Sequence, residues 1–301
     1  MKKVLIGGGT GLVGHFLSQL LRDAGYEVRL LSRSNHPDKS NVFQWDLKKG
    51  IIDSAAFREL DYVINLAGAG IADKRWTAER KKLIIDSRVL TTNLLLKYIR
   101  EEGASVKAFV SASAIGYYGD SGETEVSETS GPGTGFLAES TQAWEDAIFQ
   151  DQQTIRTAAI RIGIVSSTNG GALAKLILPA RFGLATYFGD GQQWFSWIHI
   201  QDLCRMFLHL LEQESLSGSF NGVAPNPVRM KSLVAGIREA VGIPGLMLPI
   251  PEFLMRIPMG EMADVLFTSA RVSSKKVEDT GFNFAFPALQ PALKDILQRR
   301  I

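Results

Sequence analysis

Near its amino terminus the chain reads Val4-Leu5-Ile6-Gly7-Gly8-Gly9-Thr10-Gly11-Leu12-Val13-Gly14, an apolar run followed by regularly spaced glycines. Such a run predicts a buried strand, and the residues that follow the glycines begin a helical pattern. At the junction, Gly8 permits a tight turn, Gly11 lets the backbone approach a pyrophosphate, and Gly14 lets the helix pack on the strand. The N-terminus of the helix would add free N–H groups and a partial positive charge. The stretch therefore predicts a dinucleotide site whose contacts are Gly8, Thr10, Gly11, Leu12 and Gly14.

The alternation of strand and helix continues through the first 165 residues and then loosens. The β-rich runs that predict strands are Val4-Leu5-Ile6, Glu27 to Leu31, Val42 to Trp45, Tyr62 to Leu66, Ala108 to Ser111 and Thr157 to Val165. Helical spacing is found at Leu12 to Ala24 and at Glu79 to Arg100. This order predicts the α/β class, here a Rossmann-type doubly wound parallel sheet covered on both faces. We predict a nucleotide-binding Rossmann domain over residues 1–165 and a smaller C-terminal substrate lobe over residues 166–301, with returns to the first domain.

The residues after the second predicted strand choose between the two nicotinamide cofactors. The run is Leu30-Leu31-Ser32-Arg33-Ser34, and the first acid after it is Asp38. An acidic side chain at this point bonds the ribose 2′-hydroxyl of NAD, whereas an arginine suits the 2′-phosphate of NADP. Arg33 can hold that phosphate by a charge-assisted contact, with Ser32 beside it. The alternative is a surface arginine by chance, but the missing acid and the flanking hydroxyls favour NADP(H).

Composition and charge narrow the class of protein. The formal net charge is +2, with 45% hydrophobic and 21% charged residues, a balance typical of a soluble globular protein without a nucleic-acid footprint. The apolar stretch Ala172 to Phe188 contains Lys175, Pro179 and Arg181 and is too interrupted to span a bilayer. The single cysteine, Cys204, excludes an internal disulfide framework and is interpreted as a buried small hydrophobe. We predict a cytoplasmic protein that acts on a small-molecule substrate, without nucleic acid, membrane or metal as a partner. The pattern predicts no oligomeric state.

Several motifs together carry a resemblance to a known family. They are Gly8-x-x-Gly11-x-x-Gly14, Asn65-Leu66-Ala67-Gly68, Ser111-Ala112-Ser113, Ala67-Gly68-x-x-Ile71-x-x-x-Arg75-Trp76, Ser87-Arg88-x-x-x-Thr92, Trp197-Ile198-His199-Ile200-x-Asp202-Leu203, Asn221-Gly222-Val223-Ala224-Pro225 and Gly281-Phe282-x-Phe284-x-Phe286-Pro287-x-Leu289. With these motifs the chain resembles the extended short-chain dehydrogenase/reductase superfamily. Within it, the chain is similar to the atypical, NAD-dependent epimerase/dehydratase-like branch of cell-division-inhibitor-like epimerase family proteins.

The resemblance implies further cofactor contacts. Leu66 and Ala67, at the end of the fourth predicted strand, would pass under the adenosine ribose and the pyrophosphate. Arg88, on the following helix, would face the cofactor, and Asp46-Leu47 would lie beside the adenine. Each position has a second interpretation: Leu66 and Ala67 as core residues only, and Arg88 as a charge on the surface of its helix.

The resemblance also implies a chemistry that this chain meets only in part. The superfamily uses a serine and a Tyr-x-x-x-Lys pair, in which the lysine ammonium lowers the pKa of the tyrosine. Ser113 matches the serine, but Phe136-Leu137-Ala138-Glu139-Ser140 stands where the pair is expected, and none of the six tyrosines has a lysine four residues later. We therefore predict Ser113 and Tyr117 as the catalytic residues, with Glu139 as a less favoured acid. Tyr117 is equally consistent with packing, and Glu139 with a role in the first turn of its helix.

The expected substrate region departs from the sugar-nucleotide epimerases as well. Those enzymes often carry an arginine that grips a diphosphate where this chain has Phe195, and an aromatic ring cannot neutralise a diphosphate. We expect the loop from Trp194 to Trp197 to line a pocket beside the nicotinamide, and His199 to be structural. The leading hypothesis is an NADP(H)-dependent oxidoreductase or epimerase-like enzyme for a small carbonyl or hydroxyl substrate. The rival hypothesis is a catalytically silent NADP(H)-binding sensor or regulatory protein.

Overall fold

A central sheet of eight strands forms the core of the computed structural model, which describes residues 1–34, 36, 38–167 and 170–298. The strands follow the order β13-β8-β6-β5-β1-β2-β3-β4, and every neighbouring pair is parallel except β3 with β4. Their bounds are β1 Lys3–Gly7, β2 Glu27–Ser32, β3 Val42–Asp46, β4 Ile51–Ile52, β5 Tyr62–Asn65, β6 Ala108–Ala114, β8 Arg156–Ile162 and β13 Gly218–Gly222. The predicted α/β class and parallel sheet are confirmed. The division at residue 165 stays a prediction.

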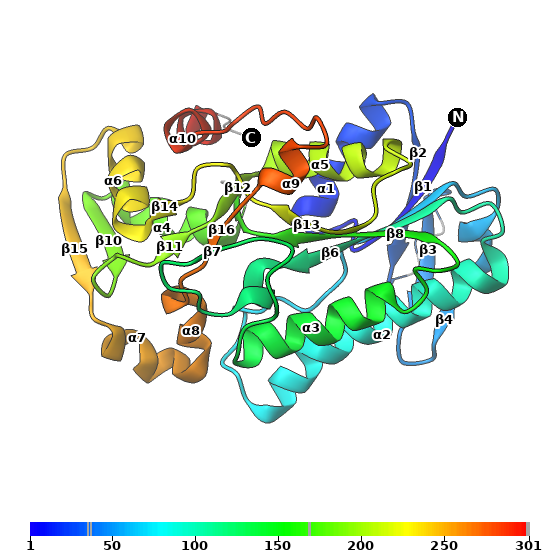
Figure 1. The fold of residues 1–301 in the computed structure, drawn as a ribbon, viewed down its shortest axis with the longest axis horizontal. Helices are drawn as coiled ribbons and strands as arrows, with labels where there is room; N and C mark the ends of the chain where they lie inside the picture. Colours follow the sequence, from blue (N-terminus) through cyan, green and yellow to red (C-terminus); the bar gives the residue numbers. More distant parts are fainter. Residues whose placement is uncertain (35, 37, 168–169, 299–301) are drawn as a thin grey trace.

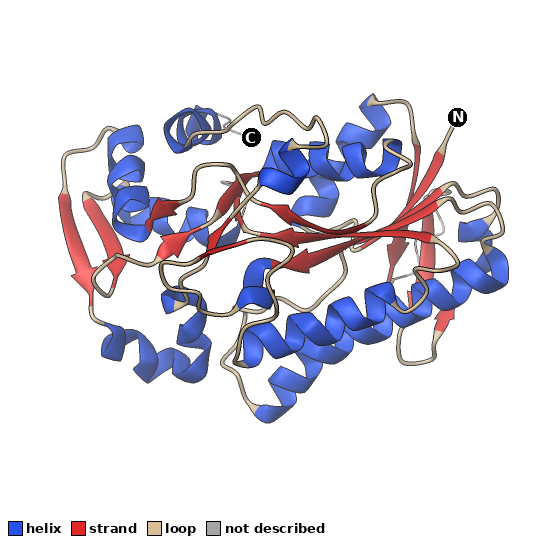
Figure 2. Cartoon of the chain, viewed as in Figure 1, coloured by secondary structure: helices blue, strands red, loops and turns tan. Residues whose placement is uncertain are grey.

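Helices cover both faces of this sheet. In Figure 1, α1 (Leu12–Asp23) and α5 (Ile200–Glu212) lie above it, and α2 (Ala78–Glu102) and α3 (Phe136–Phe149) lie below it. Figure 2 shows the strands as one continuous layer between the two layers of helices. Helix α1 buries Gly14, Leu17, Ser18 and Leu21, the spacing of a single helical face. The helices predicted from the spacing are thus found within one or two residues of their expected ends.

One predicted strand is wrong in its extent. The run Thr157 to Val165 is not continuous: β8 ends at Ile162, and β9 (Ile164–Ser166) leaves the sheet to pair with β12 (Trp197–His199). Gly163 is the break, since a Cβ there would lie 2.5 Å from the carbonyl oxygen of Ser196 and 2.8 Å from Val223 Cγ1. The apolar run hides this change of partner because the hydrophobic character of the sequence continues through both segments.

The remaining elements build the C-terminal lobe. They are β10 Leu184–Phe188 paired with β15 Leu246–Ile250, β11 Trp194–Phe195 with β14 Val228–Arg229, β16 Arg271–Val272 with β7 Glu125–Val126, and the helices α4 Gly171–Ala180, α6 Met230–Val241, α7 Glu252–Met259, α8 Asp264–Phe267, α9 Lys275–Glu278 and α10 Leu289–Gln298. Short 3-10 helices are η1 Ser54–Phe57, η2 Ile115–Tyr118 and η3 Gly260–Ala263. A second apolar core lies between α4, α6, α10 and the inner side of β10. Across the described ranges, no helix is both long and apolar enough to cross a membrane.

Candidate functional site

The glycine turn joins β1 to α1 at the carboxyl edge of the sheet. Gly8 has φ +81°, and a Cβ there would lie 2.8 Å from Leu66 C and Ala67 N, so this position needs glycine on two grounds. A Cβ on Gly14 would collide with the backbone of Gly8 and Gly9, which explains why the helix can approach so closely. Gly11 caps α1 and, as a glycine, offers no side-chain hydrogen bond to the N–H groups of the first turn. Thr10 is exposed beside it, and Leu12 opens the helix.

Ser32 and Arg33 lie where the ribose would be expected. Ser32 ends β2, and its Oγ accepts a hydrogen bond of 3.1 Å from the backbone N–H of Ser34. His36 Nε2 lies 3.1 Å from the same hydroxyl. Arg33 is exposed at this edge. A hydroxyl and an imidazole therefore meet here, and the exposed Arg33 follows Ser32 in the chain; these are groups of the kind that donate to a phosphate.

The loop after β5 is held against the glycine turn by a buried amide. Asn65 Oδ1 accepts a hydrogen bond of 3.1 Å from Ala67 N, and Asn65 Nδ2 donates to Thr92 Oγ1 at 3.1 Å. Leu66 and Ala67 are thereby fixed beside Gly8, partly exposed at the same edge. Sequence reasoning named these two residues and missed Asn65, whose polar side chain at the end of an apolar strand was the available signal.

Arg88 brings a largely buried cation to this loop. Its Nη1 donates to the carbonyl oxygens of Ala69 (3.0 Å) and Ile84 (2.9 Å), and its guanidinium lies over the Trp144 ring at 5.1 Å. Burial lowers the pKa of Arg88 to about 10. Within the described chain its hydrogen-bond acceptors are these two carbonyls, so no carboxylate bonds its charge. Arg88 is therefore not a solvated surface charge but a buried one that an anion would stabilise.

Ser113 belongs to a buried charged network beneath the sheet edge. It is 2% exposed, and its Oγ donates a hydrogen bond of 2.6 Å to Glu145 Oε1. Glu145 also forms a bidentate ion pair with Arg161, and both N–O distances are 2.8 Å. Because a serine hydroxyl has one proton, that proton is committed to the carboxylate.

The network continues to the last strand of the sheet. Arg161 Nη1 donates to Tyr118 Oη at 2.9 Å, and Tyr118 donates to Asn221 Oδ1 at 2.6 Å. Burial raises the pKa of Tyr118 to about 12, against the opposing effect of Arg161. Sequence reasoning missed Glu145, Arg161 and Tyr118. The signal was an arginine within an otherwise apolar central strand, which requires a partner.

Tyr117 lies on the other side of α3 from the position of the expected catalytic pair. Its ring packs on the Arg161 guanidinium, with 3.6 Å between Cζ and the ring centroid. It lines a surface hollow of about 400 Å³ whose other walls are Gln142, Glu145, Asp146, Phe149, Gln150 and Ser219. At 3.6 residues per turn, Glu145 faces opposite to Phe136, and Gln142 and Phe149 face roughly opposite to Ser140. The structure does not bring Tyr117 to the helix face that bears Phe136 and Ser140.

On that face of α3 the side chains are already packed or hydrogen-bonded within the protein. Phe136 packs edge-on against Trp76, with 4.8 Å between ring centroids, in an apolar cluster that includes Met262. Ser140 is buried and donates to the carbonyl oxygen of Leu137 at 3.1 Å. Glu139 is exposed in the first turn of the helix, as its structural interpretation requires.

The aromatic loop differs from the expectation, because only its first residue reaches the surface. Phe195 and Trp197 are buried in the second apolar core. Trp194 lies between two guanidinium groups, 3.8 Å from Arg229 and 5.1 Å from Arg271. The expectation that the whole loop lines a pocket is therefore wrong.

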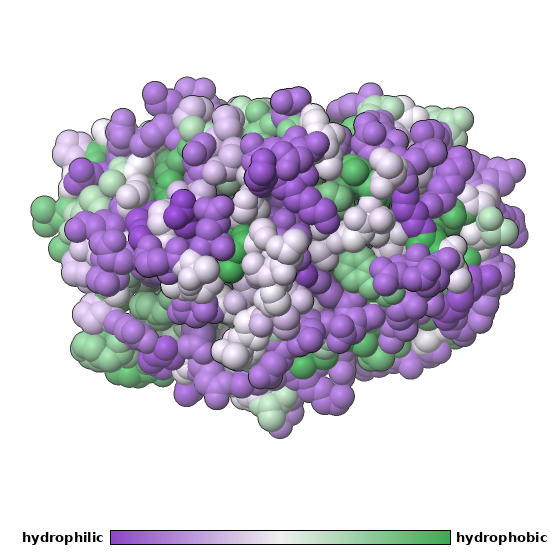
Figure 3. Space-filling view, in the orientation of Figure 1, coloured by the Kyte–Doolittle hydropathy of each residue, from purple (hydrophilic) through white to green (hydrophobic). Residues whose placement is uncertain are grey.

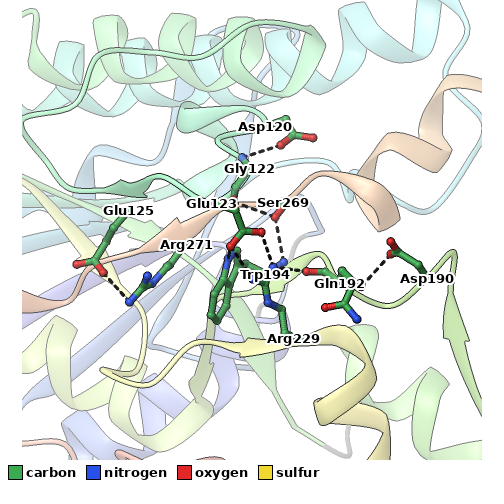
Figure 4. A network of polar contacts seen from close by, with 10 residues as sticks. All are labelled: Asp120, Gly122, Glu123, Glu125, Asp190, Gln192, Trp194, Arg229, Ser269 and Arg271. Atoms are coloured by element: carbon green, nitrogen blue, oxygen red, sulfur yellow. Dashed lines mark hydrogen bonds and ion pairs between the residues drawn. The ribbon is translucent and has the colours of Figure 1, made fainter.

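Trp194 is instead part of a network of polar contacts that involves the C-terminal lobe, shown in Figure 4. Glu123, on the loop after η2, bonds both terminal nitrogens of Arg229 and accepts a bond of 3.2 Å from Trp194 Nε1. Arg271 pairs with Glu125 at 3.2 Å, and Ser269 Oγ accepts a bond of 3.0 Å from Trp194 N. Arg229 pairs with Glu123 and Arg271 with Glu125, while Arg271 Nε is buried without a hydrogen-bond partner among the described residues.

Two predicted structural residues are confirmed. His199 is fully buried: its Nδ1 accepts a bond of 3.2 Å from Gln201 N, and its Nε2 lies 3.2 Å from Asp295 Oδ2. It therefore ties β12 to α10. Cys204 is buried in α5, and burial raises the pKa of its thiol to about 12, which makes it unreactive.

Comparison with known proteins places this geometry in context. The model described as "NAD dependent epimerase/dehydratase family" matches residues 4–221, and a domain of unknown function (DUF1731) matches residues 250–296. Epimerase family protein SDR39U1 of Mus musculus is 34% identical over 98% of this chain and 99% of its own length. A chloroplastic homologue from Arabidopsis thaliana is 34% identical over 98% of this chain and 86% of its own. The crystal structure of human epimerase family protein SDR39U1 (isoform 2) with NADPH has a TM-score of 0.90 and 33% identity, covering 99% of each chain.

Proposed function

This chain belongs to the NAD dependent epimerase/dehydratase family, and from that premise we propose that it binds NADP(H) and acts as an oxidoreductase or epimerase-like enzyme on a small carbonyl or hydroxyl substrate. When bound, the nicotinamide supplies or accepts a hydride. The observation that carries the cofactor choice is Arg33, exposed beside Ser32 at the end of β2 with no acidic residue before Asp38. The human relative solved with NADPH supports the same choice.

In this proposal the pyrophosphate lies at the N-terminus of α1. Gly8, Thr10, Gly11 and Leu12 present backbone to it, and Gly14 keeps the helix close to the strand. The missing side chain at Gly8 supports the fit, because any Cβ there would strike the loop of Leu66 and Ala67. That loop would pass beneath the cofactor.

Arg88 completes the proposed cofactor site. Its charge is hydrogen-bonded only to carbonyl oxygens in the described chain, and the phosphates of a dinucleotide would bring negative charge to this edge. The bound cofactor would compensate a charge that the protein leaves without a carboxylate. Glycine at position 68 makes room for it, since a Cβ there would lie 3.2 Å from Arg88 Cζ.

The proposed catalytic residues are Ser113 and Tyr117, and the geometry sets a condition on each. Ser113 can donate to a substrate oxygen only by giving up its bond to Glu145. Tyr117 can reach the face of Phe136 only if η2 changes its conformation. These conditions give weight to the second candidate function, a silent NADP(H)-binding sensor or regulatory protein. The specific observation in its favour is that Phe136 has no proton to donate and that Ser140 already donates its hydroxyl proton to the carbonyl oxygen of Leu137.

One experiment separates the two functions. The protein is saturated with NADPH and presented with a library of aldehydes and ketones, and the loss of NADPH absorbance is followed. An enzyme oxidises NADPH with at least one carbonyl, in proportion to protein concentration. A protein that holds NADPH tightly and oxidises it with none of them is the silent binder.

Two further expectations stay proposals. Nucleotide sugars should bind poorly, because Phe195 is buried and offers no charge to a diphosphate. Calorimetry with UDP- and GDP-sugars tests this, and micromolar binding would contradict it. The cytoplasmic location rests on the sequence alone, and the Arabidopsis relative bears a chloroplastic name.

A further inference from the structure

The loop between β5 and α2, together with the first turn of α2, carries more positive charge than its surroundings neutralise. Residues 70–82 include five basic and two acidic side chains. Three of the basic side chains form ion pairs, which are Arg80 with Asp73, Lys81 with Glu261 and Lys82 with Asp86. Lys74 and Arg75 form neither an ion pair nor a hydrogen bond with any residue that the structure describes.

Arg75 is positioned by a glycine of the C-terminal lobe. Gly260, the first residue of η3, has φ +58°, and a Cβ there would lie 2.7 Å from Arg75 Nε and 3.0 Å from Arg75 Nη2. The absent side chain therefore leaves room for the guanidinium beside the backbone of η3. The next residue of η3, Glu261, is bonded to Lys81. Arg75 thus reaches the C-terminal lobe without meeting a carboxylate there.

The loop that carries Arg75 is held in place from both of its ends. Trp76, the next residue, is buried, and its Nε1 donates a hydrogen bond of 2.9 Å to the carbonyl oxygen of Ile71. Near the start of the loop, the backbone N–H of Ala69 donates to Ser87 Oγ at 2.9 Å, which ties the loop to α2. A loop that is already fixed loses little conformational freedom when it binds a ligand, so its cation is preorganised for an anion.

The charge of Arg80 is only weakly compensated as well. Its side chain is 13% exposed, its Nε is buried without a hydrogen-bond partner among the described residues, and its carboxylate partner Asp73 lies 3.4 Å away and is 67% exposed. Burial, and then the positive charge of Arg80, lower the pKa of Arg88. The two guanidinium groups therefore repel each other, and an anion near this loop would stabilise both.

Arg75 lies beside the position where the resemblance expects the catalytic tyrosine. Trp76 packs against Phe136, which stands at that position, with 4.8 Å between the ring centroids. Met259 and Met262, on either side of the glycine that Arg75 contacts, belong to the same apolar cluster as Phe136. An anion bound by Arg75 would thus lie at the edge of the region in which a substrate is expected.

The proposed contacts with the cofactor phosphates lie elsewhere along the sheet edge. Arg88 follows Arg80 by eight residues, which is roughly 12 Å along α2. Arg33 follows β2, and β1 separates that strand from β5. An anion at Arg75 would therefore be additional to the phosphates of the cofactor. Figure 3 shows mostly hydrophilic side chains along the lower right edge of the molecule, where Figure 1 draws α2, so this side of the helix faces water.

We propose that the substrate of this chain carries an acidic group, a carboxylate or a phosphate, and that Arg75 binds it. The inference rests on the proposed function, because it takes the ligand beside Phe136 to be the substrate. Arg75 is exposed and presents a planar fork of N–H donors that fits either anion. The acidic group would hold one end of the substrate while the apolar cluster packs against the rest.

Calorimetry on the full chain saturated with NADP⁺ tests this with two matched pairs of probes. The first pair is 2-oxobutanoate and its neutral amide, and the second is dihydroxyacetone phosphate and dihydroxyacetone. We expect one acid to bind at least about tenfold more tightly than its neutral partner, the scale of a charge-assisted contact. The pair that shows this preference identifies the acidic group as a carboxylate or a phosphate.

The variant Arg75→Gln should abolish the preference for the acid. Its affinity for NADP⁺ and its thermal midpoint should stay native, because Arg75 is exposed and has no bonding partner in the described chain. Lys82→Gln is the matched control, since it removes one positive charge from the same segment while the Lys82 ammonium bonds Asp86 and not a ligand. This control should keep the preference.

Equal affinities within both pairs of probes overturn the proposal, and so does a preference that Arg75→Gln leaves intact or that Lys82→Gln removes. A loss of NADP⁺ affinity in Arg75→Gln overturns it too, because the arginine would then belong to the cofactor site. Failure of the proposed enzyme has a different signature. A preference for the acid without oxidation of NADPH by any carbonyl supports the anion site and contradicts the enzyme, whereas turnover of neutral ketones without any such preference supports the enzyme and overturns the anion site.

Discussion

The glycine turn beside β1 and the start of α3 lie along the same edge of the sheet and differ sharply in what they retain. At the glycine turn each position still has the shape that a dinucleotide needs, down to the two grounds on which Gly8 must be glycine. At the start of α3, Phe136 is packed and has no acidic proton, and Ser140 commits its hydroxyl proton to the carbonyl oxygen of Leu137. In the proposed site, binding of the cofactor and catalysis with it therefore rest on separate residues, and one set can be lost without the other.

The largest expected effect comes from the charged network under the sheet. Glu145→Leu would leave Arg161 buried without its carboxylate, and we expect a loss of about 3–5 kcal/mol in the free energy of unfolding. Denaturant unfolding measures it. Glu139→Leu, on the exposed side of the same helix, should change it by less than about 0.5 kcal/mol. Equal stability of the two variants would mean that the network does not support the fold.

The second-largest expected effect concerns the proposed cofactor site at the glycine turn. Gly8→Ala adds a Cβ against the backbone of Leu66 and Ala67 at φ +81°, and we expect it to weaken NADPH binding by about 2–4 kcal/mol. Gly25→Ala is the matched control, because Gly25 has φ +84° but no atom within 4 Å of its Cβ position. The control should lose some stability and keep its affinity for NADPH. Equal affinities in the two variants would place the cofactor elsewhere.

The variant Arg33→Asp tests whether Arg33 is the cause of a preference for NADPH over NADH. We expect NADPH binding to weaken by about 1–3 kcal/mol, the scale of a lost hydrogen bond between charged groups. NADH lacks the 2′-phosphate, so its affinity should stay the same or rise. Titration of cofactor fluorescence with both molecules measures this, and an equal loss for NADH and NADPH would show that Arg33 does not contact the phosphate.

The last variant removes a single hydroxyl and tests whether Tyr117 is the proton donor. Tyr117→Phe keeps the ring over Arg161 and removes a hydroxyl that bonds to no described residue, so NADPH affinity and stability should stay within about 0.5 kcal/mol of native. The proposed role as proton donor predicts a loss of turnover of roughly 100-fold. Native turnover with any carbonyl found in the screen would remove Tyr117 from the mechanism.

Much of the fold could be predicted because its signals are local. The apolar runs, the helical spacing and the glycine turn each lie within a dozen residues. The break at Gly163 could not be predicted, since its cause is the backbone of Ser196. Contacts between distant parts of a chain do not appear in a local pattern.

The same distinction between local signals and distant contacts applies to the candidate site. The glycine turn and the places of Leu66 and Ala67 could be expected from the sequence and the resemblance, and the structure brings Leu66 beside Gly8. The partner of Ser113 is Glu145, 32 residues away, and the side of α3 that Tyr117 faces depends on how η2 turns. The structure places Ser113 and Tyr117 against the same buried pair, with Ser113 bonded to Glu145 and the Tyr117 ring against Arg161, and neither contact could be predicted from the four-residue spacing.

The measurement that tests the central claim most directly is the ratio of the dissociation constants of the native chain for NADH and NADPH. Fluorescence titration of both at one salt concentration gives it, independently of any substrate. The account predicts that NADPH binds at least about ten times more tightly, as a charge-assisted phosphate contact requires. Equal affinities, or tighter binding of NADH, would contradict it.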